Sequence, residues 1–350
     1  MSRIISVGTA YPPHVMNQSE ARAFAKRHFQ HSFPHIDRLL PIFEHTAIEE
    51  RRFSRPQEWF EKEPSFYERN QAYIEVACQL GEEAIRKCLS LSNTDPTEID
   101  HIFFVSTSGL ATPSIDAHLI NQLKMKLNTK RTPIWGLGCA GGVAGLARGY
   151  EYVQAFPHAK VLVVALELCS LTFRSQDFSK SNLVATALFA DGAAAVLLAG
   201  EEAGIEIGPR ILTTQSHLWP DSFDVMGWQL QNDGLEVIFS RDIPSLVRQE
   251  VTPVVDRFLQ ENRLSRSDMS RWVMHPGGLK VLQAYEDAFE CPREVFDHAY
   301  EVLRQFGNMS SATVLFVLEK ELKESHQFGS YGLMAALGPG FSAELLLLQW

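Results

Sequence analysis

The sequence predicts an α/β fold built from two similar halves, and three observations lead to this prediction. Strand-like and helix-like segments alternate along the chain, a pattern typical of sheets covered by helices. The run Lys160–Glu167 is almost purely apolar, as expected for a strand buried on both faces. A strand, a turn and a helix follow one another around Cys139 and again around Asn308, so the second half repeats the first. A Glu- and Gly-rich seam between them gives halves of residues 1–204 and 205–350.

The elements of the first half follow from apolar spacing and from the turns between them. Apolar residues at helical spacing predict a helix over Asn70–Leu89. The strand Ile102–Val105 ends in Ser-Thr-Ser-Gly, and the strand Pro133–Leu137 runs into glycines before a helix that starts near Val143. The last two strands of this half are Lys160–Glu167 and Ala193–Ala199, the latter preceded by a turn at Asp191-Gly192.

The second half opens with an amphipathic helix, Ile243–Leu259. The strand Arg271–Met274 then stops at His275-Pro276-Gly277-Gly278, and a later turn at Gly307–Ser311 opens the helix Ala312–Leu322. The final strands are Leu333–Leu337 and Leu345–Leu348, which flank Gly338-Pro339-Gly340.

Composition excludes several classes of protein. The 32 basic and 42 acidic residues give a formal charge of −10, which argues against a general nucleic-acid binder. No stretch reaches the ~18–20 unbroken apolar residues that cross a bilayer, and Pro12-Pro13 interrupts the first apolar run too early for a signal peptide. The five cysteines are odd in number and lack a CxxC pair, which disfavours a disulfide framework or a zinc site. We therefore expect a cytoplasmic, soluble and reduced protein.

The segment Gly136–Gly141 matches G-x-G-x-x-G between a strand and a helix, which is the fingerprint of a dinucleotide site. Glu167 ends the next strand, where an acid could bind a ribose. An NAD-dependent oxidoreductase is therefore one alternative. The fingerprint alone is common, however, and it leaves the turns at His275 and Asn308 without a role.

Cys139 offers a second interpretation of the same segment. A thiol at a strand-to-helix turn lies near the positive end of a helix dipole, which favours the thiolate, and neighbouring amides can hold an oxyanion. Only this cysteine has glycines on both sides and a helix starting beyond it. The others lie in apolar runs or beside a proline and are expected to be structural: Cys78, Cys88, Cys169 and Cys291.

A nucleophilic thiol needs partners, and two polar residues lie in comparable turns. His275 ends an apolar strand, so it projects into a turn, although a single histidine there is more often structural. Asn308 precedes a helix, and taken alone it is typical of an N-cap. The catalytic interpretation depends on the coincidence of three such turns in one chain.

These turns resemble those of the type III polyketide synthases, the chalcone and stilbene synthase family. The similar segments keep the family's order over roughly residues 100 to 342. They are Leu137-Gly138-Cys139-Ala140, Leu188–Ala195, His275-Pro276-Gly277-Gly278, Gly307–Ala312 with Val314–Glu319, and Leu337–Phe341, although Ala336-Leu337 stands where the family usually has Gly-Phe.

The resemblance implies an acyltransferase with a five-layered thiolase-like αβαβα fold, acting as a homodimer on acyl-CoA and malonyl-CoA without a metal or redox cofactor. Cys139 would accept the acyl group, since a thioester keeps a good leaving group. His275 would hold the thiolate and, with Asn308, stabilise the enolate formed on decarboxylation. Phe189 would be the aromatic gatekeeper between the CoA tunnel and the cavity. The other substrate-binding positions that we expect are Thr107, Ser108, Thr112, Val237, Ser310, Gly338, Pro339 and Gly340.

Two departures from the plant enzymes bear on the substrate. Val237 stands where they carry a second gatekeeper Phe, and Thr112 where they carry a Met that crosses into the partner. Smaller side chains leave volume, which predicts a long apolar tunnel for fatty acyl starters, as in the bacterial relatives that form alkylpyrones and alkylresorcinols. Alternatively, neighbours such as Trp228 fill the space and leave a small cavity.

The CoA phosphates require cations, and Arg51, Arg52 and Arg55 follow a segment that resembles the superfamily's Thr-Gly-Ile…Arg stretch. A solvated surface cluster is almost as consistent with these residues. The main rival function is a β-ketoacyl-[acyl-carrier-protein] synthase, which would usually show His-Gln-Ala-Asn and Asn-Thr-Ser in the two later turns. A catalytically silent acyl-binding relative is a further alternative.

Overall fold

A computed structural model describes residues 2–240 and 242–350 of the chain. Nine strands form one mixed sheet in the order β11-β12-β13-β8-β1-β7-β6-β4-β5, and two separate two-stranded sheets, β2–β3 and the β9–β10 hairpin, stand apart from it. The strands are β1 Arg3–Ala10, β2 His14–Asn17, β3 Glu50–Phe53, β4 His101–Val105, β5 Lys130–Ile134, β6 Lys160–Leu168, β7 Asp191–Ala199, β8 Arg210–Leu218, β9 Met226–Gln231, β10 Gly234–Phe239, β11 Met269–Met274, β12 Tyr331–Gly338 and β13 Ser342–Gln349. The α-helices are α1 Gln18–Phe29, α2 Gln57–Phe60, α3 Phe66–Leu91, α4 Ile115–Gln122, α5 Gly141–Ala155, α6 Lys180–Leu188, α7 Ile243–Leu246, α8 Thr252–Glu261, α9 Leu279–Phe289, α10 Asp297–Phe306 and α11 Thr313–Glu321.

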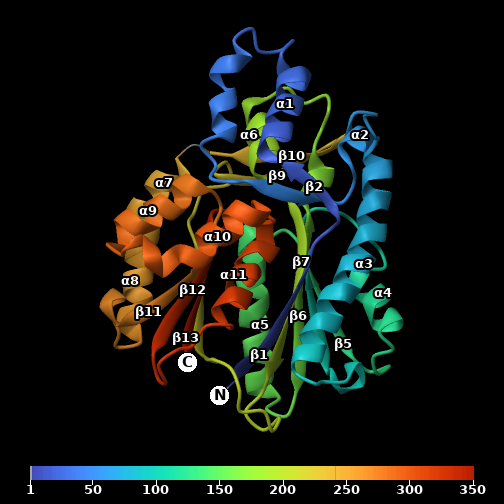
Figure 1. The fold of residues 1–350 in the computed structure, drawn as a ribbon. Coiled ribbons are helices and arrows are strands. Elements are labelled where there is room, and N and C mark those ends of the chain that lie inside the picture. Colours follow the sequence, from blue (N-terminus) through green and yellow to red (C-terminus); the bar gives the residue numbers. More distant parts are fainter. Residues whose placement is uncertain (1, 241) are drawn as a thin grey trace.

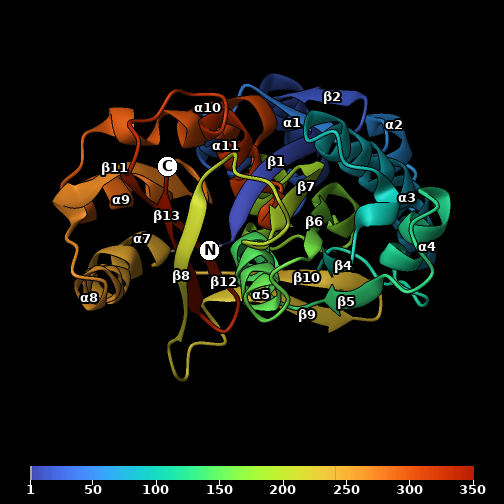
Figure 2. The same ribbon diagram turned by 90° about the horizontal axis from the view of Figure 1, so that it is seen from below.

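The elements stack in five layers, α-β-α-β-α. Strands β1 and β4–β7 make one half of the sheet and strands β8 and β11–β13 the other, and the halves join where Arg3 pairs with Arg210. Helices α5 and α11 lie between the two halves and contact both (Figure 2). Helices α3 and α4 cover the outer face of the first half, and α8 and α9 cover that of the second (Figure 1). The predicted α/β class is therefore correct, and the central helices are those that begin at the Cys139 and Asn308 turns.

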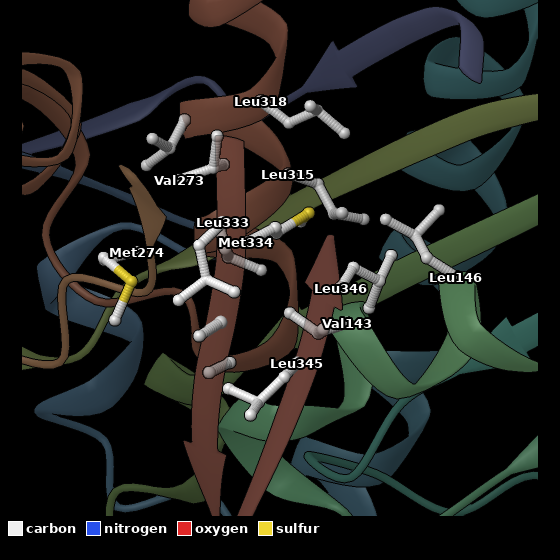
Figure 3. Close-up of a cluster of buried hydrophobic side chains, with 14 of the residues drawn as sticks. Val143, Leu146, Val273, Met274, Leu315, Leu318, Leu333, Met334, Leu345 and Leu346 are labelled. Atoms are coloured by element: carbon white, nitrogen blue, oxygen red, sulfur yellow. The ribbon is translucent and has the colours of Figure 1, made fainter. Parts of the chain in front are cut away.

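The core between the two halves is almost entirely aliphatic, because α5 and α11 bury apolar side chains against strands on both sides. These side chains interdigitate without polar groups, as is typical of a close-packed interior. Figure 3 draws 14 residues of this cluster and labels ten of them: Val143, Leu146, Val273, Met274, Leu315, Leu318, Leu333, Met334, Leu345 and Leu346.

Each predicted element is present, although several boundaries differ and three differences affect the local structure. The predicted turn at Asp191-Gly192 is the start of β7, where these residues pair with Leu168 and Glu167. Strand β5 ends at Ile134 rather than Leu137, because Gly136 adopts a φ of +92° and turns the chain toward Cys139. The amphipathic helix from Ile243 is continuous to Glu261, but it passes through a π-helical segment, Val247–Val251, between α7 and α8.

The β9–β10 hairpin and the segment from α1 to β3 lie at one end of the central layers, beside α6 (Figure 1). A separate apolar cluster holds this end together, built from α1, the 3₁₀ turns that follow it and α6. In the described part of the chain, no helix combines the length and the apolar character that a bilayer crossing requires.

Candidate active site

Cys139 lies in a tight 3₁₀ turn, Gly138–Ala140, immediately before α5. Gly138 has a φ of +47°, and a Cβ there would meet the Pro339 ring at 2.7 Å, so a larger residue would displace the turn. The Cys139 Sγ lies 3.5 Å from the Ser310 Oγ, to which it donates a hydrogen bond. The first half of the chain thus presents its thiol to a turn of the second half.

His275 directly follows β11, and its backbone N–H donates to the Ala335 carbonyl of β12 at 2.9 Å. The residue is 3% exposed, and neither ring nitrogen has a hydrogen-bond partner among the described residues. Burial lowers the pKa of the imidazole to about 3, because no nearby group offsets the loss of water. His275 is therefore a neutral base with both nitrogens available.

Asn308 is held from four directions at the start of the turn before α11. Its Nδ2 donates to the Gly277 carbonyl at 3.0 Å, which ties it to the turn after His275. Its Oδ1 accepts from the Ser310 backbone N–H at 2.8 Å, the contact that an N-cap interpretation anticipates. Its backbone pairs with the end of α6, since its N–H donates to Leu188 and its carbonyl accepts from Ala190, both at 2.9 Å. The carboxamide is thereby fixed beside the His275 and Phe189 turns.

Burial also sets the state of the thiol. Loss of solvation raises the pKa of Cys139 to about 11, while the Ser310 hydroxyl and the Asn308 carboxamide act in the opposite direction. The expectation of a resting thiolate thus finds no support, because burial favours the neutral thiol at Cys139 and the neutral imidazole at His275. A neutral thiol can still act as a nucleophile when a base takes its proton during attack on a carbonyl.

Cys139 opens into a pocket of about 360 Å³, the catalytic pocket, which is partly open to solvent and is lined on one side by the β9–β10 hairpin. A second, largely apolar pocket of about 630 Å³, the side pocket, extends toward α1 and α6. Phe189, Trp228 and Val237 line both pockets and so form the wall between them. The ring centroids of Phe189 and Trp228 are 5.8 Å apart. The remaining residues of the catalytic pocket are Gly138, Cys139, Met226, Gly227, Ile238, Phe239, Ser310 and Pro339.

A buried carboxylate, Glu167, joins the turns of the two halves behind the thiol. Its Oε2 accepts the backbone N–H groups of Thr107 and Ser108 at 3.0 Å each, and its Oε1 accepts the Ser311 hydroxyl at 2.7 Å. Burial raises its pKa to about 7. Its place in the sequence suggested only a ribose ligand, although an acid inside an otherwise apolar strand is itself a signal of an interior role.

The other predicted substrate positions are not all at the pocket. Pro339 lines it, and Gly338 packs against the nucleophile turn, where a Cβ would meet Ala140 at 2.6 Å. The Thr107 Oγ1 accepts the Gly138 N–H at 3.2 Å, so its role is to hold the turn. Thr112 is exposed and lines neither pocket. Ser108 and Gly340 likewise do not line the catalytic pocket: the Ser108 Oγ accepts the Leu168 N–H, and Gly340 lies in the turn between β12 and β13.

The three arginines that were expected at CoA phosphates are engaged elsewhere. Arg51 is fully buried, and its Nη1 donates to two backbone carbonyls of the α6 end. Arg52 pairs with Glu50 at 2.6 Å, and Arg55 pairs with Glu75 at 2.6 Å. The structure argues against Arg51 as a phosphate ligand, since an anion in solution cannot reach a guanidinium in the interior. The other two are accessible but already paired.

The chain matches the family models for the N-terminal domain of chalcone and stilbene synthases over residues 1–202 and for their C-terminal domain over residues 210–350. The chain belongs to the chalcone and stilbene synthase family. It is 47% identical to a putative chalcone synthase of Bacillus subtilis (strain 168), an alignment that covers 100% of this chain and 99% of that protein. It is 37% identical to the 1,3,6,8-tetrahydroxynaphthalene synthase of Streptomyces peucetius subsp. caesius, over 99% and 93% of the two chains.

Solved structures of the family agree with this assignment. The 1,3,6,8-tetrahydroxynaphthalene synthase of Streptomyces coelicolor A3(2), a bacterial type III polyketide synthase, superposes with a TM-score of 0.94 at 29% identity over 99% of each chain. CsyB complexed with CoA-SH superposes with a TM-score of 0.91 at 26% identity over all of both chains. The protein is accordingly a type III polyketide synthase of thiolase-like fold, and the predicted family is confirmed. These matches over the whole chain disfavour the two alternatives, an NAD-dependent oxidoreductase and a β-ketoacyl-[acyl-carrier-protein] synthase.

Proposed function

We propose that this polyketide synthase takes a fatty acyl group from its CoA thioester onto Cys139, extends it with malonyl-CoA and releases cyclised alkylpyrones or alkylresorcinols. The observation that carries the proposal is the shared wall of Phe189, Trp228 and Val237 between the catalytic pocket and the side pocket. An acyl chain bound to Cys139 would have an apolar continuation behind this wall, and its burial there would contribute roughly 0.8 kcal/mol per CH₂.

In this proposal the neutral His275 accepts the thiol proton as Cys139 attacks the acyl-CoA carbonyl. The bond from carbon to the CoA sulfur then breaks, and the proton leaves with CoA. When malonyl-CoA loses carbon dioxide, the enolate oxygen receives hydrogen bonds from the imidazole N–H and from the second N–H of Asn308. The enolate carbon attacks the carbonyl of the Cys139 thioester, and the bond from that carbonyl carbon to Sγ breaks. Cys139 leaves as the thiolate, and the extended chain is carried away on the CoA of the malonyl unit. Only side chains of this chain and the CoA substrates take part.

The exposed position of Thr112 and the free edge strand β5 support a homodimer, which we include in the proposal. An unpaired edge strand is a ready site for pairing with another chain. Light scattering on the purified protein tests this part directly: a monomer at micromolar concentration would contradict it.

A second candidate function is extension of short starters to a small aromatic product. The contact between Phe189 and Trp228 favours it, because these rings would confine a starter to the catalytic pocket of about 360 Å³. Relatives named 1,3,6,8-tetrahydroxynaphthalene synthase illustrate this class.

The experiment is a product analysis by mass spectrometry with malonyl-CoA and acyl-CoAs of graded length, without carrier protein. We expect pyrones or resorcinols from long saturated starters and, in Trp228→Ala, a shift toward still longer chains. Phe328→Ala is the matched control, since Phe328 is 93% exposed and lines neither pocket. Turnover of short starters alone by the wild-type enzyme would favour the second candidate.

A further inference from the structure

We infer that Arg51 is a positioning residue that clamps the Phe189 and Asn308 turns together and so sets both the pocket wall and the decarboxylation site. The inference rests on the roles proposed above for these two residues. Arg51 itself lies on β3, in the middle of a four-residue strand that pairs with β2. This strand is separate in sequence from the turns that carry Cys139, His275 and Asn308.

The first half of the clamp is the C-terminal end of α6. The Arg51 Nη1 donates to the Thr186 carbonyl at 2.7 Å and to the Phe189 carbonyl at 2.9 Å. The last carbonyls of a helix have no partner within the helix, and a cation there also complements the helix dipole. Phe189 is the C-cap residue of α6, so the guanidinium fixes the backbone that carries the pocket wall.

The second half of the clamp is the turn before α11. Gly307 has a φ of +69°, and a Cβ there would lie 2.7 Å from Cγ and 2.8 Å from Cδ of Arg51. The aliphatic part of the arginine therefore packs directly on the backbone next to Asn308. Only glycine allows this approach.

The two turns are also hydrogen-bonded to each other. Phe189 and Asn308 form an isolated parallel bridge, through the bonds from Asn308 to Leu188 and from Ala190 to Asn308. A displacement of one turn is therefore transmitted to the other. Arg51 contacts both sides of this bridge and can hold its position relative to β3.

The burial of Arg51 is energetically unfavourable, because the guanidinium loses its hydration. Arg51 is fully buried, and burial lowers its pKa to about 9, while the negative charge of Asp191 acts against that shift. Its Nε and Nη2 have no hydrogen-bond partner in the described ranges 2–240 and 242–350. A buried cation with unused donors is unfavourable for stability, which indicates that its retained contacts serve the geometry of the turns.

The test compares Arg51→Met and Arg51→Lys with Arg248→Met, a control that removes an exposed ion pair with Asp287. The readouts are carbon dioxide release from malonyl-CoA, starter preference and thermal unfolding. We expect kcat for carbon dioxide release to fall about tenfold or more in Arg51→Met with little change in KM, because small displacements of catalytic groups are costly. Arg51→Lys should recover part of kcat, and starter preference should broaden in both Arg51 variants.

A folded Arg51→Met with wild-type kcat and starter preference would overturn the inference. If both Arg51 variants are insoluble, Gly307→Ala replaces them, because its methyl group pushes against the Arg51 side chain. A wild-type kcat in Gly307→Ala would equally overturn the inference, and a loss of kcat supports it. Asn308→Ala is measured in parallel: if it keeps the wild-type rate, the proposed role of Asn308 fails instead.

Discussion

Gly142 lies on the nucleophile helix α5 against the backbone of the Asn308 turn, and its replacement by alanine should push the two apart. A Cβ at residue 142 would lie 2.2 Å from the Ser311 carbonyl oxygen and 3.2 Å from Val314 Cγ1. A carbon and a carbonyl oxygen rarely approach closer than about 3.3 Å, so α5 and the turn must separate by about 1 Å. The obstacle is backbone and cannot rotate away.

The expected consequences differ for stability and activity. Overpacking of this kind costs about 1–3 kcal/mol, and the better helix propensity of alanine returns up to about 1 kcal/mol. The net loss should be about 1–2 kcal/mol, and the protein stays folded. Activity should fall about 100-fold, since a 1 Å misplacement of Cys139 relative to Ser310 and Asn308 affects every step.

The assay is kcat for product formation together with thermal unfolding, and Gly149→Ala is the matched control. Gly149 lies on the same helix, but a Cβ there would meet the side chains of Leu198 at 2.6 Å and Val163 at 3.1 Å, which can adjust. The control should keep the wild-type kcat. A Gly142→Ala enzyme with wild-type kcat would refute the claim that this contact sets the spacing of the site.

Three further predictions follow from the buried ionisable groups. Burial raises the pKa of Cys139 to about 11, so its rate of alkylation by iodoacetamide should still be rising at pH 9; a plateau below pH 7 would contradict this. Burial lowers the pKa of His275 from 6.5 to about 3, so between these pH values the unfolded chain binds a proton that the folded protein does not. The free energy of unfolding should therefore fall as the pH drops from 6.5 toward 3. In His275→Gln this pH-dependent loss, on the order of a few kcal/mol, should be absent from denaturant titrations. Burial raises the pKa of Glu167 from 4.5 to about 7, so its contribution to the free energy of unfolding is complete below pH 4.5 and is lost as the pH rises through 7. Glu167→Gln should flatten this part of the dependence of stability on pH. An unchanged dependence would contradict the raised pKa of Glu167.

The charge states and the burial of two residues at the site, Cys139 and Arg51, differ from what the local sequence suggested, because both depend on tertiary packing. Local sequence indicates a thiol at a helix start, which by itself lowers a thiol pKa, whereas the three-dimensional surroundings of Cys139 remove water and raise it. Arg51 illustrates the same point: its neighbours in sequence suggest a basic surface, but the fold buries it under α6.

The sequence by itself determined the α/β class, the order of the elements that it predicted and the three turns that carry Cys139, His275 and Asn308, but it did not predict the β9–β10 hairpin that lines the pocket. These follow from local signals, because apolar periodicity, glycines and prolines act over a few residues. The resemblance of short motifs added the family, which the whole-chain matches then confirmed.

Only the tertiary structure decided what lies next to those turns. Glu167 and Ser311 are 144 positions apart, and Arg51 and Phe189 are 138 apart, so no local pattern predicts their contacts. The same holds for the wall that Trp228 and Phe189 form between the two pockets. Burial, pKa and pocket shape depend on which distant segments pack together, and that is a property of the folded chain as a whole.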